Sequence, residues 1–325
     1  VVPEESGLGK ERHKRPISYV DRPPLRRTMM SRILITGSNG QVGFELRRAL
    51  APLGEVVALT RRDVDLGDPE SVVAALDHYQ PDLIVNPAAY TAVDKAESEP
   101  ELARAVNAGA PDAMARWGAV RNVPLVHYST DYVFEGTGTT PYREDAPVNP
   151  QSIYGATKCE GEDAVRLACA QHLILRTSWV VGAHGGNFLK TILRLARERE
   201  QLRIVADQTG APTSAALIAD VTAHLVAGYL ADREHFAFGT YHLTASGETN
   251  WCEYARHVVA LAEARGLDLK LRSTDIEPIA THEYPLPAKR PMNSRLDCSK
   301  LMSTFGISLP DWRDGVDYVF DQLHD

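Results

Sequence analysis

Short apolar runs alternate with helical stretches through the first half of the chain. The runs lie at residues 32–35, 55–59, 82–86, 124–128 and 173–176. Stretches suited to helices lie between them, at residues 44–50, 71–79 and 99–118. Strands that alternate with helices in this way are typical of a parallel sheet covered on both faces. We therefore predict an α/β protein with a Rossmann-like, doubly wound parallel sheet and a smaller C-terminal α/β lobe.

The pattern becomes less regular after Trp179. Residues 187–199 have the periodicity of an amphipathic helix, and we interpret most charges on its basic face as solvated. Two polar, turn-rich loops follow at residues 207–213 and 285–297. Long loops on a rigid scaffold often carry recognition residues. These two loops are therefore candidates for ligand contacts, with a plain connecting role as the alternative.

A glycine-rich sequence, TGSNGQVG, follows the first predicted strand at residues 36–43. Its glycines, Gly37, Gly40 and Gly43, have the spacing GxxGxxG, and a helical stretch comes directly after them. Glycine at such positions permits a tight turn and close approach of the backbone to a diphosphate at the helix N-terminus. Because strand, loop and helix occur in the order that this chemistry needs, the sequence predicts a dinucleotide-binding site.

The end of the second predicted strand bears on the choice of cofactor. An acidic residue is usual there in NAD-specific sites, since it binds the ribose 2′-hydroxyl. This chain instead has Thr60, followed by Arg61 and Arg62. Guanidinium groups suit a 2′-phosphate. We predict NADPH as the cofactor, with NADH use left open and solvated loop arginines as the alternative interpretation.

A tyrosine and a lysine four residues apart, Tyr154 and Lys158, provide candidate proton-transfer chemistry. Residues at this spacing share one face of a helix. An ammonium group beside a phenol is expected to lower the phenol pKa towards neutrality. Thr130, at the end of a predicted strand, has a hydroxyl that could hold the substrate oxygen beside the phenol. These residues become meaningful together with the glycine loop, because ligands bind at the carboxyl ends of the strands in such sheets.

We divide the chain into three parts. Residues 1–29 are charged and lack the apolar core of a signal peptide, so we predict a disordered extension or tag, with a regulatory tail as the alternative. Residues 30–180 are predicted to form the NAD(P)-binding Rossmann domain, joined by elements that return from about residues 215–245. Residues 181–325 are predicted to form mainly the substrate-binding lobe.

Composition narrows the class of protein. The 325-residue chain is 44% hydrophobic, enough for a sizeable core, and has a net charge of −8. This charge argues against nucleic acid as the main partner, and no apolar run approaches the ~18 residues of a membrane span. The four cysteines are scattered without metal-binding spacing. We predict a cytoplasmic protein with reduced thiols, without nucleic-acid or membrane partners.

Several strings in this order resemble the extended short-chain dehydrogenase/reductase family. They are ITGSNGQVGFEL, NPAAYTAVDKAESEPELA, VHYSTDYVFEG, YGATKCEGE, LRTSWVVG, DQTGAPTSA and KRPMNSRLD. The resemblance runs from about Arg32 to the C-terminus and is strongest to members that reduce 4-keto sugar nucleotides. It implies hydride transfer from NADPH to C4 of dTDP-4-dehydro-L-rhamnose, giving dTDP-L-rhamnose, the last step of dTDP-rhamnose biosynthesis. The C-terminal lobe would then bind the sugar nucleotide.

The resemblance also implies roles for individual residues. The catalytic residues would be Thr130, Tyr154 and Lys158, with Tyr154 as the proton donor. The cofactor-binding residues would be Gly37, Asn39, Gly40, Gln41, Val42, Arg61, Asp65, Leu66, Ala88, Ala89, Tyr90, Tyr154 and Lys158. The substrate-binding residues would be Val93, Thr130, Asp131, Tyr132, Trp179, Asn187, Arg290 and Asn293.

The chain departs from the family at one set of positions. Some members dimerise around Mg²⁺ held by three glutamates, of which Glu45 matches the first. Ala216 and Gln322 occupy the other two positions, and neither supplies the carboxylate that Mg²⁺ prefers. We therefore predict no metal ion and a monomer or weak homodimer.

Two other functions remain open on this fold. A sugar-nucleotide dehydratase would have an acidic pair after Thr130, whereas this chain has Asp131 followed by Tyr132; an epimerase of the same fold is also an alternative. The second alternative is a non-catalytic subunit that resembles the regulatory β subunit of methionine adenosyltransferase, which has a similar RPxNxxLDCSKL stretch. The presence of Thr130, Tyr154 and Lys158 favours an enzyme.

Overall fold

The computed structural model describes residues 31–323. The prediction of an extension or tag over residues 1–29 lies outside them. Six parallel strands form the main sheet, in the order β10-β5-β4-β3-β1-β2. Their bounds are β1 Arg32–Ile35, β2 Glu55–Ala58, β3 Leu83–Asn86, β4 Leu125–Thr130, β5 His172–Thr177 and β10 Gly239–His242. The sheet order reverses beside β1, with β2 on one side and β3 on the other, which is the topology of a doubly wound sheet.

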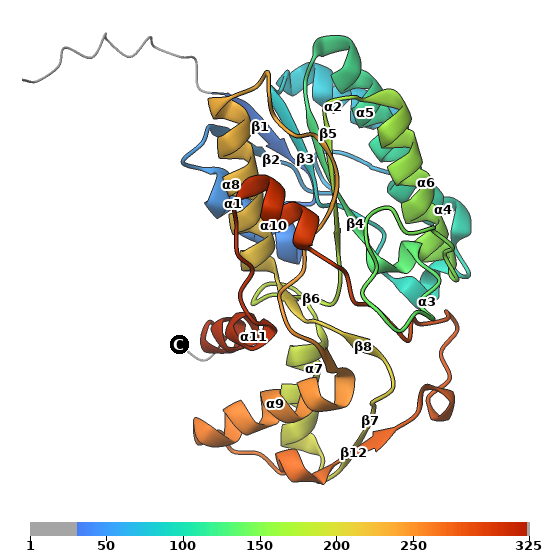
Figure 1. The fold of residues 1–325 in the computed structure, drawn as a ribbon, viewed down its shortest axis with the longest axis vertical. Helices are drawn as coiled ribbons and strands as arrows, with labels where there is room; N and C mark the ends of the chain where they lie inside the picture. Colours follow the sequence, from blue (N-terminus) through green and yellow to red (C-terminus); the bar gives the residue numbers. More distant parts are fainter. Residues whose placement is uncertain (1–30, 324–325) are drawn as a thin grey trace, which may run out of the picture. The chain divides into compact units, whose positions relative to one another are not determined.

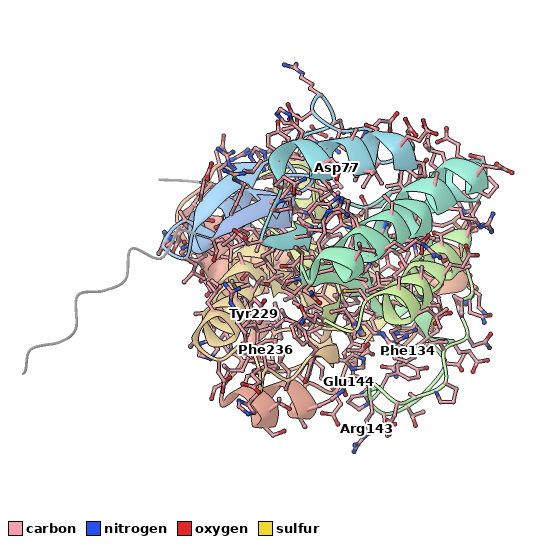
Figure 2. The ribbon with its side chains drawn as sticks, turned by 90° about the horizontal axis from the view of Figure 1, so that it is seen from above. Asp77, Phe134, Arg143, Glu144, Tyr229 and Phe236 are labelled. Atoms are coloured by element: carbon pink, nitrogen blue, oxygen red, sulfur yellow. The ribbon has the colours of Figure 1, made fainter. Side chains whose placement is uncertain are left out.

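Helices cover both faces of this sheet (Figure 1). One face packs against α1 (Gln41–Leu50), α8 (Ala215–Ala231) and α10 (Ser299–Phe305), the other against α2 (Pro69–Tyr79), α5 (Ala110–Arg121) and α6 (Ile153–Ala168). Alternate residues of β1 supply the two cores, because Ile33 and Ile35 point to one face and Leu34 to the other. Asp77 on α2 and Tyr229 on α8 mark these opposite sides (Figure 2). The predicted α/β fold with a doubly wound parallel sheet is confirmed.

A second hydrophobic core lies in the lower part of Figure 1. It is built by α7 (Phe188–Glu198), α9 (Trp251–Ala264), α11 (Trp312–Asp321) and the parallel pair β7 (Leu202–Val205) and β12 (Ile276–Ile279). Two pairs of two-residue strands join it, β6 (Val180–Val181) with β9 (Thr213–Ser214), and β8 (Thr209–Gly210) with β11 (Thr249–Asn250). Residues 215–242 return to the main sheet as α8 and β10. The division into a cofactor domain and a sugar-nucleotide lobe stays a prediction about function.

The stretch predicted as one helix at residues 99–118 is three segments. A short helix α4 (Pro100–Arg104) and α5 are separated by a π-helical turn, η1 (Ala105–Gly109). The wider turn lets Asn107 point inward, where it is fully buried. The backbone carbonyl of Asn107 packs against Gly161 of α6. A Cβ added at Gly161 would lie only 2.1 Å from that carbonyl oxygen. The predicted helical stretch is confirmed, since the backbone is helical without a break from Pro100 to Arg121. The π-helical turn inside it was not predicted, because periodicity reports the buried face and not one extra residue within a turn.

Three-residue and four-residue helical turns complete the described chain. They are α3 (Val93–Ala96), η2 (Asp131–Val133), η3 (Ser273–Asp275) and η4 (Thr281–Glu283). Other predicted bounds shift by a few residues: the first helix begins at Gln41, and β4 extends to Thr130. Within residues 31–323, no helix is both long and apolar enough to cross a membrane.

We expect Gly161→Ala to destabilise the protein by about 1–3 kcal/mol, because the new methyl group meets backbone that cannot move aside cheaply. Gly109→Ala is the matched control: its backbone is helical, with φ −63°, and a Cβ there meets no atom within 4 Å. The control should be neutral or stabilising by about 0.4–1 kcal/mol. Urea unfolding of both variants tests this, and equal midpoints for the two would contradict the close packing of α6 on the π-helical turn.

Candidate active site

The glycine loop follows β1 and leads directly into α1. Gly37 has φ +54°, and a Cβ there would lie 2.8 Å from the Cβ of Ala88, which follows β3. A Cβ at Gly43 would lie 2.2 Å from the Gly37 carbonyl oxygen. Gly40 caps α1 without a side-chain hydrogen bond, so the first N–H groups of the helix have no side-chain acceptor. This backbone cradle fits the diphosphate of a dinucleotide.

The segment after β3 lies beside this loop and is fixed by Asn107. The Tyr90 N–H donates to Asn107 Oδ1 at 2.8 Å, and Asn107 Nδ2 donates to the Tyr90 carbonyl at 3.2 Å. Asn107 Nδ2 is also 3.1 Å from the hydroxyl of Thr157 on α6. One buried amide therefore links the predicted cofactor residues 88–90 to the helix that carries Tyr154 and Lys158.

Thr130, Tyr154 and Lys158 converge at the carboxyl end of β4. Ser152 caps α6 by accepting from the Gly155 N–H, which fixes the start of the helix so that Tyr154 lies in its first turn. Hydrogen bonding by the Thr130 hydroxyl acts to lower the pKa of the Tyr154 phenol, so the two groups lie close together. The Tyr154 ring meets the Tyr132 ring edge-on, with centroids 5.4 Å apart. Lys158 is 1% exposed, and its Nζ donates to the Tyr128 carbonyl at 2.6 Å.

The structure corrects the predicted effect of Lys158 on Tyr154. Burial raises the pKa of Tyr154 to about 12, although the hydrogen bond with Thr130 lowers it. Burial also lowers the pKa of Lys158 to about 8, and the Glu162 carboxylate acts in the opposite direction. The ammonium is bound to the Tyr128 carbonyl instead of acting on the phenol. Tyr154 therefore keeps its proton at neutral pH, as a donor must.

Asp131 lies directly behind Thr130. It is 1% exposed, and its Oδ1 accepts from the Thr130 hydroxyl at 3.0 Å. Burial raises the pKa of Asp131 to about 6, while hydrogen bonds from Ser294 and Thr130 lower it. The carboxyl thus orients the Thr130 hydroxyl that contacts Tyr154.

A cavity of about 1730 Å³ opens beside Tyr132, whose ring contacts Tyr154, and extends towards the second core. Tyr132 and Trp179 line it near the end of the main sheet, and α7, β7, β12 and residues 281–292 form the rest. Its basic lining residues are Arg194, Arg199, Arg203, Arg256, Lys289 and Arg290, and its acidic ones are Asp275, Glu277 and Glu283. The excess of basic groups favours an anionic ligand. Two charges of the basic helix face, predicted to be solvated, thus line the cavity.

Trp179 has a backbone conformation that tryptophan rarely adopts, with φ +48°. Its ring stacks on Trp251 with centroids 3.8 Å apart and an interplanar angle of 19°. A Cβ at Gly210 would lie 2.7 Å from the Trp179 ring. The indole is therefore fixed at the cavity wall by elements from the second core.

Arg290 joins the cavity wall to α3. Its Nη2 donates to Asp94 Oδ2 at 2.6 Å, and the Ala288 N–H donates to Asp94 Oδ1 at 3.1 Å. Arg290 Nη1 is buried and has no hydrogen-bond partner among residues 31–323. An arginine that is held at one end and unpaired at the other can bind an anionic group in the cavity. Val93, the first residue of α3, precedes this contact.

Two predicted substrate contacts make hydrogen bonds within the protein. Asn187 caps α7, and its Nδ2 donates to Gln41 Oε1 at 2.9 Å and to the Gly182 carbonyl at 2.7 Å. Asn293 is 3% exposed, donates to the Thr140 carbonyl and accepts from Arg295. Both hold the loops around the site in place, and direct substrate contact by either stays a prediction.

The remaining predicted cofactor residues lie around the glycine loop. Asn39 and Gly40 lie in the loop, and Val42 packs against the core beneath α1. Arg61 lies in an exposed turn after β2, and the Ser38 N–H beside it donates to the Leu59 carbonyl. Asp65 accepts from the Gly67 N–H, and Leu66 packs against the core on the α2 face. Roles in binding for these residues stay predictions.

Four further residues support the site but were absent from the sequence predictions: Asn86, Asn107, His127 and Trp251. Asn86 is the last residue of β3 and His127 lies within β4, and each is 0% exposed. A polar residue in a buried strand needs a partner, so this pattern is a usable signal. Asn107 and Trp251 carry no such signal, because their partners are distant in the sequence.

The predicted metal positions contain no ligand set. Glu45 is 7% exposed and pairs with Arg48 at 3.3 Å, Ala216 is buried in α8, and Gln322 caps α11. In the described part of the chain, no three His, Cys, Asp or Glu residues are arranged to hold a metal ion. The prediction of no interfacial metal stays a prediction.

The doubly wound sheet, the glycine loop and the Thr130–Tyr154–Lys158 group define a reductase of the extended short-chain dehydrogenase/reductase class. The chain belongs to the family described as the RmlD substrate binding domain, whose model matches residues 30–324. It is 50% identical over 289 residues to the dTDP-4-dehydrorhamnose reductase of Burkholderia thailandensis, covering 88% of this chain and 96% of that one. It is 47% identical over 295 residues to the enzyme of the same name from Escherichia coli K12, covering 90% and 97%.

Solved structures agree with this assignment. A dTDP-4-dehydrorhamnose reductase from Bacillus anthracis in complex with NADP superposes with a TM-score of 0.83 and 33% identity, covering 90% of this chain and 100% of that one. An NAD complex of the UDP-glucose 4-epimerase from Thermus thermophilus reaches a TM-score of 0.70 at 21% identity, which shows a shared fold.

We expect Asp131→Asn to change how stability depends on pH. Burial raises the pKa of Asp131 in the folded protein to about 6, against the ordinary aspartate value of 3.8. Between these values the unfolded state releases the proton and the folded state keeps it, so stability falls as pH rises. Relative to the wild type, the variant should therefore gain stability from about pH 4 to pH 6, reaching roughly 2–3 kcal/mol, and then level off. Urea unfolding across this range measures the difference, and a constant difference would contradict the raised pKa.

Proposed function

We propose that the protein reduces the C4 ketone of dTDP-4-dehydro-L-rhamnose with NADPH to give dTDP-L-rhamnose. The observation that carries this proposal is the convergence of Thr130, Tyr154 and Lys158 beside the glycine loop and the basic cavity. The relatives named dTDP-4-dehydrorhamnose reductase, two of them at 47% and 50% identity, support the substrate. The related structure in complex with NADP supports the cofactor.

The chain's own residues would bind, orient and protonate the substrate. Tyr154 holds its proton at neutral pH, and would deliver it to the C4 oxygen as negative charge develops there. Thr130 would hydrogen-bond the same oxygen, with its hydroxyl oriented by Asp131. Tyr132, Trp179 and Arg290 would form the adjoining wall of the sugar-nucleotide site.

The cofactor would lie on the cradle formed by Gly37, Gly40 and the N-terminus of α1. NADPH supplies a hydride when it is bound there. Residues 88–90 would flank it, held by Asn107, and Lys158 would bind the nicotinamide ribose. Within residues 31–323 neither the Arg61 nor the Arg62 guanidinium has a hydrogen-bond partner, so both could bind a 2′-phosphate. NADH use stays open.

The alternative functions have less support. A dehydratase would need a second acid where this chain has Tyr132, and Tyr132 contacts Tyr154 through its ring. A non-catalytic subunit resembling the methionine adenosyltransferase β subunit would not require Thr130, Tyr154 and Lys158 together. The family match and the names of the relatives favour the reductase. A cytoplasmic location and a monomer or weak homodimer stay parts of the proposal.

Turnover with dTDP-4-dehydro-L-rhamnose tests the function directly. We expect loss of NADPH absorbance that depends on both protein and sugar nucleotide, with dTDP-L-rhamnose as the product by mass spectrometry. Tyr154→Phe should still bind NADPH in a fluorescence titration but lose about 10²–10⁴-fold in kcat, because it lacks the proton donor. Absence of turnover in the folded wild-type protein would refute the activity. Full activity of the variant would refute the role of Tyr154.

Replacing both Arg61 and Arg62 by alanine should weaken NADPH binding more than NADH binding, because only NADPH has the 2′-phosphate. We expect about tenfold or more selective loss of NADPH affinity from removing these charged contacts. Arg116→Ala is the control, since Arg116 is an exposed arginine on α5 paired with Asp112. Equal weakening of both cofactors in the double variant would show that the two arginines do not read the phosphate.

A further inference from the structure

Four buried polar side chains form a continuous hydrogen-bond chain that crosses the main sheet to Lys158. The Thr36 hydroxyl, just before Gly37, lies 2.6 Å from Asn86 Oδ1. Asn86 Nδ2 lies 3.1 Å from His127 Nδ1, and His127 Nε2 lies 3.1 Å from Lys158 Nζ. The four residues are at most 1% exposed. Thr36 directly follows β1, Asn86 and His127 lie on β3 and β4, and Lys158 lies on α6. This hydrogen-bond chain has no access to solvent.

The protons of this chain can be assigned by counting donors and acceptors. With Lys158 charged, all Nζ hydrogens are donors, so His127 Nε2 must accept. The neutral imidazole then carries its proton on Nδ1 and needs an acceptor, which is the Asn86 carbonyl oxygen once the amide is turned over. The Asn86 amide NH₂ would then donate to the Thr36 hydroxyl. Amide orientation is assigned from such networks, because oxygen and nitrogen are nearly isosteric.

With Lys158 neutral, the same chain is satisfied in the opposite direction. The Thr36 hydroxyl donates to Asn86 Oδ1, Asn86 Nδ2 donates to His127 Nδ1, and His127 Nε2 donates to the lysine amine. This is the amide orientation that the structure has. Both directions leave no member unpaired, which matters because an unsatisfied buried polar group costs about 1–3 kcal/mol.

We propose that His127 and Asn86 are positioning residues for Lys158, and that the chain reverses its direction as a unit when Lys158 gains or loses its proton. The inference rests on the proposed function for the role of Lys158 in turnover. Two of the three N–H bonds of the ammonium are taken by His127 and the Tyr128 carbonyl. The remaining N–H bond is the one available to a ligand on the Tyr154 side of the helix.

The charged groups around Lys158 come from three elements. Tyr154 and Glu162 lie on α6 with it, His127 is on β4 with Asp131 just after it, and Arg176 is on β5. Glu162 is paired with Arg176 at 2.7 Å, and its carboxylate raises the pKa of Lys158 against the effect of burial. Burial and the lysine charge hold the pKa of His127 well below its usual value. The His127 ring therefore stays neutral while the hydrogen bonds from Thr36 to Lys158 reverse their direction.

The side-chain ¹⁵N chemical shifts of His127 test this without any activity, because they distinguish the two neutral tautomers. The experiment uses the whole protein with ¹⁵N-labelled histidine, and His127→Gln identifies the signal. We expect the Nδ1–H tautomer below the pKa of Lys158, which lies at about 8, and the Nε2–H tautomer above it. A single tautomer across this range, or ordinary imidazole protonation near the usual pKa, would overturn the proposal.

Kinetics of two variants test the positioning role. His127→Leu removes the acceptor that favours the ammonium, so the alkaline limb of the kcat profile should move to lower pH and kcat should fall by about tenfold or more. His127→Gln keeps one acceptor and one donor and should restore most of kcat and the position of the limb. Equal losses in both variants without movement of the limb would refute positioning.

Thr222→Val is the matched control, since it removes another buried hydroxyl, which bonds the Tyr128 phenol at 2.7 Å. It should lower the melting temperature without moving the alkaline limb. Should His127→Leu not fold, Thr36→Val at the far end of the chain should move the limb in the same direction by a smaller amount, and an unchanged limb there would count against the chain. Failure of the proposed function is distinguishable, because it would abolish wild-type turnover while leaving the tautomer experiment intact.

Discussion

The buried ammonium of Lys158 is the constraint on which the arrangement of the site depends. Moving a charged group out of water costs several kcal/mol unless partners compensate for the lost hydration. Lys158 obtains these partners from strand β4, namely the Tyr128 carbonyl and the His127 ring. Because both partners belong to the central sheet, α6 can satisfy its lysine only in one register against β4. That register also places Tyr154 beside Thr130.

The next turn of α6 carries the compensating negative charge. Glu162 is 0% exposed and accepts two hydrogen bonds from Arg176, at 2.8 and 2.7 Å. Arg176 also stacks over Phe134, and the His242 N–H donates to Glu144. In Figure 2, Phe134 and Glu144 lie on the segment after β4, and Arg143 points outward from it. The pair therefore ties α6, β5 and this segment together behind Thr130 and Tyr154, and Glu162 also pairs with Arg166 at 2.9 Å.

Sequence reasoning worked best where a single segment determines its own structure. The strand–loop–helix at residues 32–50 was recognisable because glycine spacing and apolar runs are local signals, and β1 and α1 have those bounds within a few residues. The π-helical turn at residues 105–109 was missed, since it depends on Asn107 finding partners on Tyr90 and Thr157. The pKa of Tyr154 was predicted in the wrong direction for a related reason. Spacing on a helix shows that two side chains share a face, but not which distant group each one binds.

Trp179 shows how the second core reaches the carboxyl end of the main sheet. A tryptophan at positive φ is costly and persists only where its surroundings fix it. Here the surroundings include the stacked ring of Trp251 and the close backbone of Gly210, both from the part of the chain after β5. The ring lies two residues after the end of β5, and β5 pairs with β4 from Leu125 to Thr130. Packing in the second core thus sets the position of Trp179, a cavity residue, relative to Thr130. The fold itself therefore aligns the cavity with the end of β4, before any ligand binds.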